Sequence, residues 1–389
     1  MEDDPADFLS RAAFLSDPGL AAVWDALPGA RVVGGAVRDT IAGRPVTDID
    51  LATPQPPGTV LAALAAAGLR GVPTGLPHGT VTAIADSRPF EVTTLRRDIA
   101  TDGRHATVAF TDDWLADAAR RDFTINAMSV DRAGRLHDPF GGRADLAAGQ
   151  VRFVGDARAR IAEDYLRALR FFRFHARYGL GAPGSETLAA VTEAVSGLAR
   201  LSPERVWSEL KRILAADRPE AALAAMRDTG VLAAVLPEAA QVSVDHLPPD
   251  PLLRLAALLD SQALDIEALA GRLRLSAAER GRLAALLGPA PEEDASEAEL
   301  RRALADAPAE TLDARVRLAR RTETLRRRLA AIEAPVFPLQ GRDLVAAGVP
   351  AGPAVGGLLR ILRAFWRQGG CVAGRDALLA ELAARRGGW

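Results

Sequence analysis

The sequence predicts an α+β protein in which a small mixed or antiparallel sheet with helices is followed by a long all-helical region. Stretches at 72–74, 80–84 and 90–95 alternate in polarity or carry β-branched residues, and an Ala- and Leu-rich helix is expected at 59–67. These segments do not repeat as βαβ units, which favours a mixed sheet over a parallel one. From Ala157 onward the pattern is helical.

Composition and cysteine content exclude several classes of protein. The chain has 389 residues, 49% hydrophobic and 25% charged, which is ordinary for a soluble protein of two or more domains. Its longest apolar run, at 60–69, is far shorter than the roughly 20 residues of a membrane span, and the start at Met1 is acidic, unlike a secretion signal. The single cysteine, Cys371, excludes an intrachain disulfide and fits a reducing compartment. We therefore expect a cytoplasmic protein.

The charge balance argues against a protein that coats nucleic acid. The formal net charge is −2, whereas non-specific nucleic-acid binders are strongly basic. An enzyme with a local basic surface remains compatible with this balance. A run of arginines between 315 and 328 is either such a surface or a solvated helix face.

The most informative stretch for chemistry reads GGAVRD from Gly34, followed by DID from Asp48. A short strand would lead into the glycine turn and then into a helix at 36–42, whose first backbone amides can approach a phosphate. Asp48 and Asp50 are two residues apart, so on a strand both carboxylates face the same side. Such a pair can hold Mg²⁺ together with substrate phosphates. The combination predicts nucleotidyl transfer.

This order of motifs resembles the signature of the DNA polymerase β-like nucleotidyltransferases. The similar branch contains the class II tRNA nucleotidyltransferases, or CCA-adding enzymes, and the bacterial poly(A) polymerases. Three further segments resemble motifs of that family: RRDFTINA at 120–127, EDYLR at 163–167 and ERVWSEL at 204–210. We expect the last of these segments to support the site structurally and not to take part in the chemistry.

The resemblance implies a domain plan. It places a polymerase β-like catalytic head at 1–155 and a helical neck, which selects the nucleotide base and binds RNA, at 156–225. A helical body and tail that bind tRNA would follow at 226–389.

The resemblance also implies roles for individual residues. Asp48 and Asp50 would hold the Mg²⁺ ions that activate the attacking hydroxyl and stabilise the leaving pyrophosphate. Glu91 is a third candidate for a catalytic carboxylate, unless it is a solvated residue of an amphipathic strand. The residues expected to bind the nucleotide are Gly34, Gly35, Arg38, Arg121, Asp122, Asn126, Glu163, Asp164, Arg167 and Arg170. Of these, the first three and Arg121 would hold the triphosphate, and Asp122 and Asn126 would lie near the ribose.

Base choice follows from hydrogen-bonding capacity. Cytosine and adenine both present an amino donor beside a ring-nitrogen acceptor, whereas uracil and guanine present a carbonyl beside a ring N–H. Asp164 only accepts and Arg167 only donates, and on one helix over 159–178 they would share a face. This pair would take C and A and reject U and G. Glu163, one turn before Arg167, would orient it; an ordinary surface ion pair is the alternative.

A polar stretch near the head bears on which bases are added. Residues 98–105 contain a glycine and lack apolar periodicity, so we expect a mobile loop between 97 and 110. By its position, this segment resembles the flexible loop that the family needs for the final A addition. Its presence argues against an enzyme that adds only CC.

The expected activity is template-independent, Mg²⁺-dependent addition of CCA to the 3′ end of tRNA from CTP and ATP. Poly(A) polymerase and specialised CC- or A-adding enzymes remain open within the same class. A catalytically silent RNA-binding protein is the alternative from another class, and the intact Asp48 and Asp50 argue against it. We expect no membrane association, and no protein partner is evident.

Overall fold

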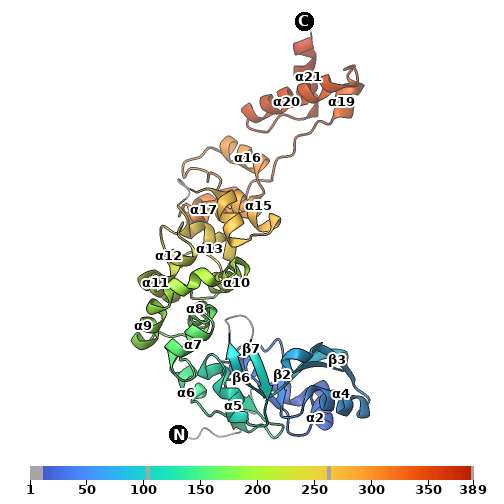
Figure 1. Ribbon diagram of the computed structural model, residues 1–389. Helices are drawn as coiled ribbons and strands as arrows, with labels where there is room; N and C mark the ends of the chain where they lie inside the picture. Colours follow the sequence, from blue (N-terminus) through green and yellow to red (C-terminus); the bar gives the residue numbers. More distant parts are fainter. Residues whose placement is uncertain (1–11, 102–105, 261–263, 387–389) are drawn as a thin grey trace. The chain divides into compact units, whose positions relative to one another are not determined.

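The computed structural model describes residues 12–101, 106–260 and 264–386. The chain forms two compact units, Met1–Asp245 and His246–Trp389. Strands lie in the N-terminal, blue-to-teal part of the chain, and the described remainder is helical (Figure 1). The expected α+β class is confirmed, and the finer division into head, neck and body stays a prediction.

A seven-stranded mixed sheet lies at the centre of the first unit, in the order β3-β4-β5-β2-β1-β8-β9. Strand β2 runs parallel to β5, and the other neighbours are antiparallel. The strands are β1 (Arg31–Val33), β2 (Asp50–Thr53), β3 (Arg70–Gly75), β4 (Thr80–Ala85), β5 (Arg88–Thr94), β8 (Ser129–Val130) and β9 (Leu136–His137). The strands expected near 72–74, 80–84 and 90–95 are all present.

One face of this sheet is covered by helices. Helices α2 (Pro18–Ala26) and α4 (Pro57–Ala66) contact β3 and β4. On β5 the buried residues Phe90 and Val92 belong to the same core as the helices. Because side chains alternate along a strand, Glu91 points to the opposite face, which is the face left for the site.

A separate two-stranded sheet replaces the loop expected between 97 and 110. Strands β6 (Arg96–Thr101) and β7 (Ala106–Phe110) pair antiparallel. The expectation of an unpaired loop was wrong for these strands, because backbone pairing between them supplies the order that apolar periodicity does not reveal. The dipeptide Asp-Gly at 102–103 is a hairpin signal in the sequence. Residues 102–105 themselves lie outside the described residues.

The first unit has further helices, some beside the sheet and the rest following it along the chain. They are η1 (Ala13–Ser16), α3 (Gly35–Ile41), η2 (Leu76–His78), α5 (Trp114–Ala119), η3 (Thr124–Asn126), α6 (Gly142–Ala147), α7 (Ala157–Glu163), α8 (Leu166–Tyr178), α9 (Ser185–Glu193), η4 (Val195–Arg200), α10 (Pro203–Leu214), α11 (Glu220–Asp228) and α12 (Val231–Val235). Aromatic packing fastens α8 to the head: the ring of Phe123 lies 4.7 Å from that of Phe153 and 5.1 Å from that of Phe174, between centroids. Such pairs add about 0.5–1.5 kcal/mol beyond their area burial.

The single helix expected over 159–178 is in fact two helices, and this expectation was wrong. Between α7 and α8, Asp164 has an extended backbone with φ −154° and ψ 108°. Its side chain accepts a hydrogen bond from the amide of Leu166 at 3.0 Å. Aspartate breaks helices in this way by offering the backbone a local partner, so Asp164 lies at the junction and not on a helix face.

The second unit is helical throughout its described residues. Its helices are α13 (Pro251–Leu258), α14 (Ile266–Leu273), α15 (Ala277–Leu286), α16 (Glu297–Asp306), α17 (Ala309–Leu318), α18 (Glu323–Ala330), α19 (Gly341–Ala346), α20 (Pro353–Gln368) and α21 (Arg375–Arg386). Within the described ranges, no helix is both long and apolar enough to cross a membrane.

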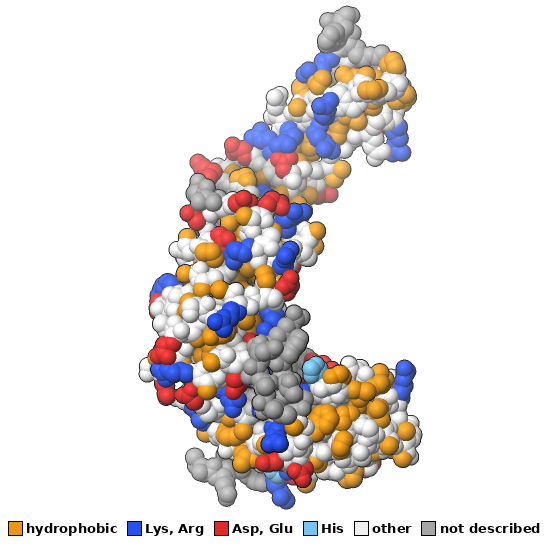
Figure 2. Space-filling model, viewed as in Figure 1, with side chains coloured by type: hydrophobic (Ala, Val, Ile, Leu, Met, Phe, Trp, Pro, Cys, Tyr) orange, Lys and Arg blue, Asp and Glu red, His pale blue; other side chains and the backbone are white. Residues whose placement is uncertain are grey.

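The arginine run between 315 and 328 makes contacts within this unit. Arg317 and Arg326 both bind Asp313, at 2.8 and 2.6 Å, and Arg321 pairs with Glu292. Figure 2 shows blue basic and red acidic side chains mixed over the visible surface. The run therefore serves the packing of α17 and α18 against the preceding segment, which favours the structural interpretation over a phosphate-binding one.

Candidate active site

Two carboxylates meet at the end of the central strands. Asp50 opens β2 and stands opposite Glu91 in the parallel register with β5. Burial and the charges of Glu91 and Asp48 raise the pKa of Asp50 above its usual range, although Arg121 opposes the shift. Negative charge is thus concentrated at one strand end, where a cation or a proton is favoured.

Asp48 lies just outside the strand on which it was expected. Pairing between β1 and β2 ends at Val33 opposite Asp50, so no neighbouring backbone extends β2 back to Asp48. The Asp48 side chain is exposed and accepts a hydrogen bond from the Thr47 hydroxyl at 3.1 Å. Its charge nevertheless acts on Asp50.

The glycine turn brings a helix and an arginine to this strand end. Gly34 has φ +66° and ψ −117°, and a Cβ atom there would lie 3.3 Å from Nη1 of Arg121. Only glycine adopts this conformation without strain. The Arg121 guanidinium is held by Asp117, one turn earlier, at 3.2 Å, and donates to the carbonyl of Asn126 at 3.4 Å. Arg121 is therefore fixed beside the turn.

Asp117 is a buried anchor for two arginines. Its side chain contacts Arg120 at 2.7 Å as well as Arg121, and also accepts from the Arg96 amide at 3.2 Å. Burial alone would raise the pKa of Asp117, but these partners outweigh burial and lower it. The carboxylate is thus ionised and keeps the positive charges in place.

A hydrogen-bond chain runs from the neck helix into the head. Arg170 of α8 donates from Nε to Asp122 at 2.7 Å, and Asp122 accepts from the Asn126 side chain at 3.0 Å. Asn126 in turn accepts from Arg38 at 2.6 Å, and Arg38 also holds Asp39 at 3.0 Å. Burial alone would raise the pKa of Asp122, yet Arg170 and the other donors outweigh it and lower the value. Four of the expected nucleotide-binding residues, Arg170, Asp122, Asn126 and Arg38, therefore form one chain of hydrogen bonds.

On the neck side, each member of the expected base-reading pair has its own support. Asp164 accepts from Arg205 of α10 at 2.6 Å. Arg167 contacts Glu163 and donates to the carbonyl of Arg160 at 3.0 Å. Glu163 is also bound by Arg160 at 3.0 Å, so it contacts two arginines, and its role in orienting Arg167 stays a prediction. Although Asp164 is not helical, both side chains still border one cavity.

These groups line a single cavity of about 530 Å³, which is within the usual size range for ligand sites. The expected residues that border it are Gly34, Gly35, Arg38, Asp50, Glu91, Arg121, Asp122, Asn126, Asp164, Arg167 and Arg170. Asp48 and Glu163 are not among the residues that border this cavity. Arginines face a carboxylate pair across the cavity, an arrangement that suits a polyphosphate with a cation.

The carboxylates of the cavity could hold a divalent metal ion only with help from a substrate. Among the described residues, no group of three His, Cys, Asp or Glu side chains is gathered to hold a metal alone. A divalent cation would therefore rest on Asp50 and a neighbouring carboxylate together with nucleotide oxygens, as Mg²⁺ commonly does. The raised pKa of Asp50 supports this fit, because a cation relieves the repulsion from Glu91 and Asp48.

Known proteins with similar sequences decide the family. Residues 30–152 match the Poly A polymerase head domain, and residues 184–242 match the "Probable RNA and SrmB- binding site of polymerase A". The chain is 38% identical over 375 residues to CCA tRNA nucleotidyltransferase 1, mitochondrial, of Mus musculus, covering 90% of this chain and 86% of that one. The chain belongs to the CCA tRNA nucleotidyltransferase family.

Other members of the CCA tRNA nucleotidyltransferase family are similar to this chain in sequence or in fold. The CCA-adding enzyme of Geobacillus kaustophilus is 33% identical over 376 residues, covering 86% of this chain and 87% of that one. The Bacillus stearothermophilus CCA-adding enzyme in complex with CTP superposes with a TM-score of 0.76 at 27% identity, covering 95% and 98% of the two chains. A tRNA nucleotidyltransferase complexed with a primer tRNA and an incoming ATP analog shares the fold, with a TM-score of 0.62 at 23% identity over 77% and 93%. The family expected from the motifs is confirmed.

Several residues of this family member's cavity were not expected from the sequence. Arg96, Arg120 and Arg205 border it, and Asp117 anchors one side. Asp117 precedes Arg121 by four residues on a helical segment, a spacing that signals an ion pair. Arg205 lies in the ERVWSEL segment, and its contact with Asp164 shows how that segment supports the site.

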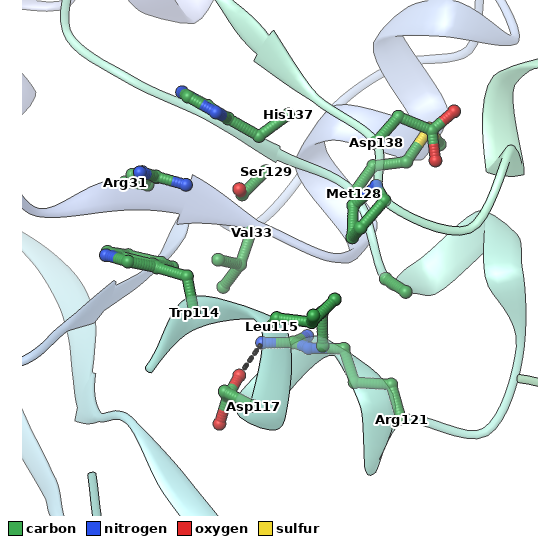
Figure 3. Close-up of a pocket in the computed structure, with 13 residues that line it drawn as sticks. Arg31, Val33, Trp114, Leu115, Asp117, Arg121, Met128, Ser129, His137 and Asp138 are labelled. Atoms are coloured by element: carbon green, nitrogen blue, oxygen red, sulfur yellow. Dashed lines mark hydrogen bonds and ion pairs between the residues drawn. The ribbon is translucent and has the colours of Figure 1, made fainter. Parts of the chain in front are cut away.

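A second cavity of about 360 Å³, shown in Figure 3, adjoins the active-site cavity. It shares Asp117 and Arg121 with the active-site cavity. The Arg31 guanidinium lies 4.0 Å from the centre of the Trp114 ring on its border. The Arg121–Asp117 pair, dashed in Figure 3, borders this cavity as well.

Proposed function

We propose that this chain is a template-independent CCA-adding enzyme, which transfers CMP and AMP from CTP and ATP to the 3′ end of tRNA. The observation that carries the proposal is the shared cavity, in which Asp50 and Glu91 from the head face Asp164 and Arg167 from the neck. One end suits phosphate chemistry and the other suits reading a base. Family membership supports the same activity.

At the carboxylate end, the proposed cofactor is Mg²⁺ held by Asp48 and Asp50, with Glu91 adding negative charge beside them. When bound, the cation would activate the attacking hydroxyl and stabilise the leaving pyrophosphate. The chain itself positions the triphosphate through the Gly34 turn and Arg121. Because Asp117 fixes Arg121 before substrate binds, little ordering of that side chain is needed, which is the advantage of a preorganised charge.

Other arginines and polar groups of the cavity would complete the nucleotide site. Arg38 and Gly35 would support the triphosphate, and Asp122 with Asn126 would lie near the ribose. Arg38 is engaged by Asp39 and Asn126 in the structure, so it acts chiefly by holding the network and adding positive charge. Arg170, fixed by Asp122, adds charge on the neck side.

At the neck end, Asp164 would accept from the amino group of C or A, and Arg167 would donate to the ring nitrogen. Both are held: Arg205 binds one oxygen of Asp164, and Glu163 holds Arg167. The other oxygen of Asp164 accepts from the Leu166 amide, and a carboxylate that accepts one hydrogen bond on each oxygen still keeps further lone pairs. A fixed acceptor and a fixed donor would thus select C and A with one site.

The experiment is to incubate the protein with CTP, ATP and Mg²⁺ and with tRNA that lacks its CCA end, and to sequence the products. We expect CCA and nothing longer. A poly(A) tail would favour poly(A) polymerase, and products ending in CC, or A added only to tRNA that already ends in CC, would identify a specialised enzyme. RNA binding without any product would favour a silent RNA-binding protein. The Asp50→Ala variant is the negative control, and Asp228→Ala, at an exposed position of α11, is the matched positive control.

We also propose a cytoplasmic location, on the ground that the single cysteine, Cys371, fits a reducing compartment. The names of some relatives specify the mitochondrion. Fractionation of cells that express the tagged chain tests the proposal, and recovery in a membrane or organelle fraction would contradict it.

A further inference from the structure

We propose that an arginine-lined cavity adjoining the nucleotide cavity binds a second phosphate group, supplied either by the backbone of the RNA primer or by released pyrophosphate. This cavity, the arginine cavity, has a volume of about 500 Å³. Its charged lining residues are Arg38, Arg44, Arg173, Arg177, Arg212 and Asp217. The inference rests on the proposed function for the identity of the two phosphate sources, but phosphate binding itself can be measured without catalysis.

The arginine cavity adjoins the nucleotide cavity. Arg38 and Phe174 border both. On α8, Arg173 and Arg177 are four residues apart and share a helix face, and Arg212 comes from the neighbouring helix α10. A phosphate that leaves the nucleotide cavity, or one upstream of the reacting 3′ end, therefore meets these side chains next.

Positive charge exceeds negative charge here. Within the described part of the chain, three carboxylates pair with the five guanidinium groups that line the cavity. Arg38 and Arg177 share Asp39, at 3.0 and 3.9 Å. Arg173 and Arg212 share Glu209, at 3.2 and 3.7 Å, and Arg44 reaches Asp217 at 3.5 Å. The three longest of these contacts, made by Arg177, Arg212 and Arg44, leave hydrogen-bonding capacity for an anion.

The excess of positive charge affects the pKa of Arg173, a largely buried arginine of the cavity. Burial lowers the pKa of Arg173 to about 10; Glu209 opposes the change, while Arg170 and Arg212 add to it. An arginine that is both desolvated and close to like charges is stabilised when an anion enters. A phosphate is the anion that guanidinium forks bind best, through two parallel hydrogen bonds.

Aromatic rings hold the guanidinium groups in position. Arg38, Arg44 and Arg177 lie 4.7, 5.5 and 5.5 Å from the centre of the Tyr178 ring, and Arg173 lies 4.6 Å from that of Phe174. Stacking of this kind restrains a guanidinium while its N–H edges stay available. Preorganised donors lose less entropy on binding, as expected of a binding site.

Depth in the cavity separates the roles of the arginines. Arg173 is 15% exposed and forms the floor, whereas Arg177 and Arg212 are 48% and 59% exposed and form the rim. The rim residues make only the longer contacts with the buried carboxylates, 3.9 Å from Arg177 to Asp39 and 3.7 Å from Arg212 to Glu209. They are therefore the better test positions.

The test compares Arg177→Gln and Arg212→Gln with Arg227→Gln, an arginine of α11 that is 58% exposed and pairs with Asp228. Two direct binding measurements are made on each full-length protein without nucleotide. Fluorescence anisotropy with labelled tRNA lacking its CCA end is measured over a range of salt concentrations, and titration calorimetry is done with inorganic pyrophosphate.

If the RNA backbone is the source, each rim variant weakens RNA binding about fivefold and reduces the salt slope by about 0.7, the effect of one lost contact to a single strand. If pyrophosphate is the source, its Kd rises by a similar factor and RNA binding is unchanged. Either result supports the site. Rim variants that match Arg227→Gln in both measurements overturn it. Because no catalysis is required, a protein that binds through this cavity but adds no nucleotide refutes the proposed function alone.

Discussion

The buried ion pair between Arg170 and Asp122 allows a sharp test of how the head and neck are joined. Replacing Arg170 with Ala leaves the Asp122 carboxylate, with a side chain only 9% exposed, without its cationic partner. Removing one member of a buried pair costs about 3–5 kcal/mol. Since Arg170 is itself 31% exposed, we expect the lower end, about 3 kcal/mol of unfolding free energy at pH 7.

The contribution of Asp122 to the unfolding free energy should depend on pH in opposite directions in the wild type and in Arg170→Ala. In the wild type, the lowered pKa of Asp122 means that its contribution is complete above the unfolded value of about 3.9 and is lost as pH falls through the folded value. Without Arg170, burial dominates and raises the folded pKa, so the variant regains stability as pH falls from 7 toward 4. The deficit relative to wild type should therefore shrink on acidification.

Urea unfolding followed by fluorescence between pH 4 and 8 measures this effect. Asp122→Asn combined with Arg170→Ala should be more stable at pH 7 than Arg170→Ala alone, because a neutral amide tolerates burial better than an unpaired charge. Arg158→Ala, which removes an exposed pair with Glu193, is the control and should have no measurable effect. An Arg170→Ala protein as stable as this control, with no pH dependence of its own, would refute the reasoning.

Three further predictions concern single positions. Asp50→Asn should reduce both C and A addition by about a hundredfold or more at unchanged RNA affinity; radiolabelled incorporation and anisotropy check this, and activity within tenfold of wild type contradicts it. Gly34→Ala forces a side chain into φ +66° beside Arg121, which costs about 1–2 kcal/mol of strain, so its kcat/KM for CTP should fall about tenfold. In the control Gly35→Ala, the added Cβ meets only Arg38 at 3.6 Å, so its kcat/KM should fall less. Equal losses in the two variants would argue against a conformational cause. Gly197→Ala places a Cβ 1.9 Å from the Tyr165 ring and should cost about 1–3 kcal/mol in thermal or urea unfolding, an expectation that unchanged stability would contradict.

The head could be predicted well because its signals are local. Alternation identifies β4 and β5, and the two glycines followed by a helical stretch identify the turn at Gly34. Glu91 was a candidate from its strand alone, but only the parallel register of β2 with β5 places it opposite Asp50. Parallel pairing joins residues far apart in sequence, and no spacing rule reports it.

The neck shows where local signals fail. The charges around Glu163 and Arg167 have helical spacing, so the sequence favours one helix through Asp164. The break is favoured by the Asp164 side chain, which caps α8 and binds Arg205, 41 residues later. Tertiary contacts of this kind override helix propensity, and the same is true of the pairing that orders β6 and β7.

The arginine cavity could not be read from the sequence at all. Its arginines come from α3, the loop after it, α8 and α10. Apart from Arg38, which the motif assigns to the triphosphate, none of them belongs to a recognised motif. The contiguous run between 315 and 328 attracted attention instead, yet those side chains pair within their own unit. Charge clusters in space and charge clusters in sequence are separate properties.

The most direct test of the account is the nucleotide selectivity of the base-reading pair. We would measure kcat/KM for CTP, ATP, UTP and GTP on tRNA lacking CCA and on tRNA ending in CC, for the wild type and for Arg167→Ala. The wild type should prefer CTP on the first RNA and ATP on the second. Loss of the Arg167 donor should reduce the free energy of discrimination against UTP and GTP by about 1–3 kcal/mol, which is what a good bidentate base contact contributes. An Arg167→Ala enzyme with wild-type ratios would contradict the claim that Asp164 and Arg167 select the base.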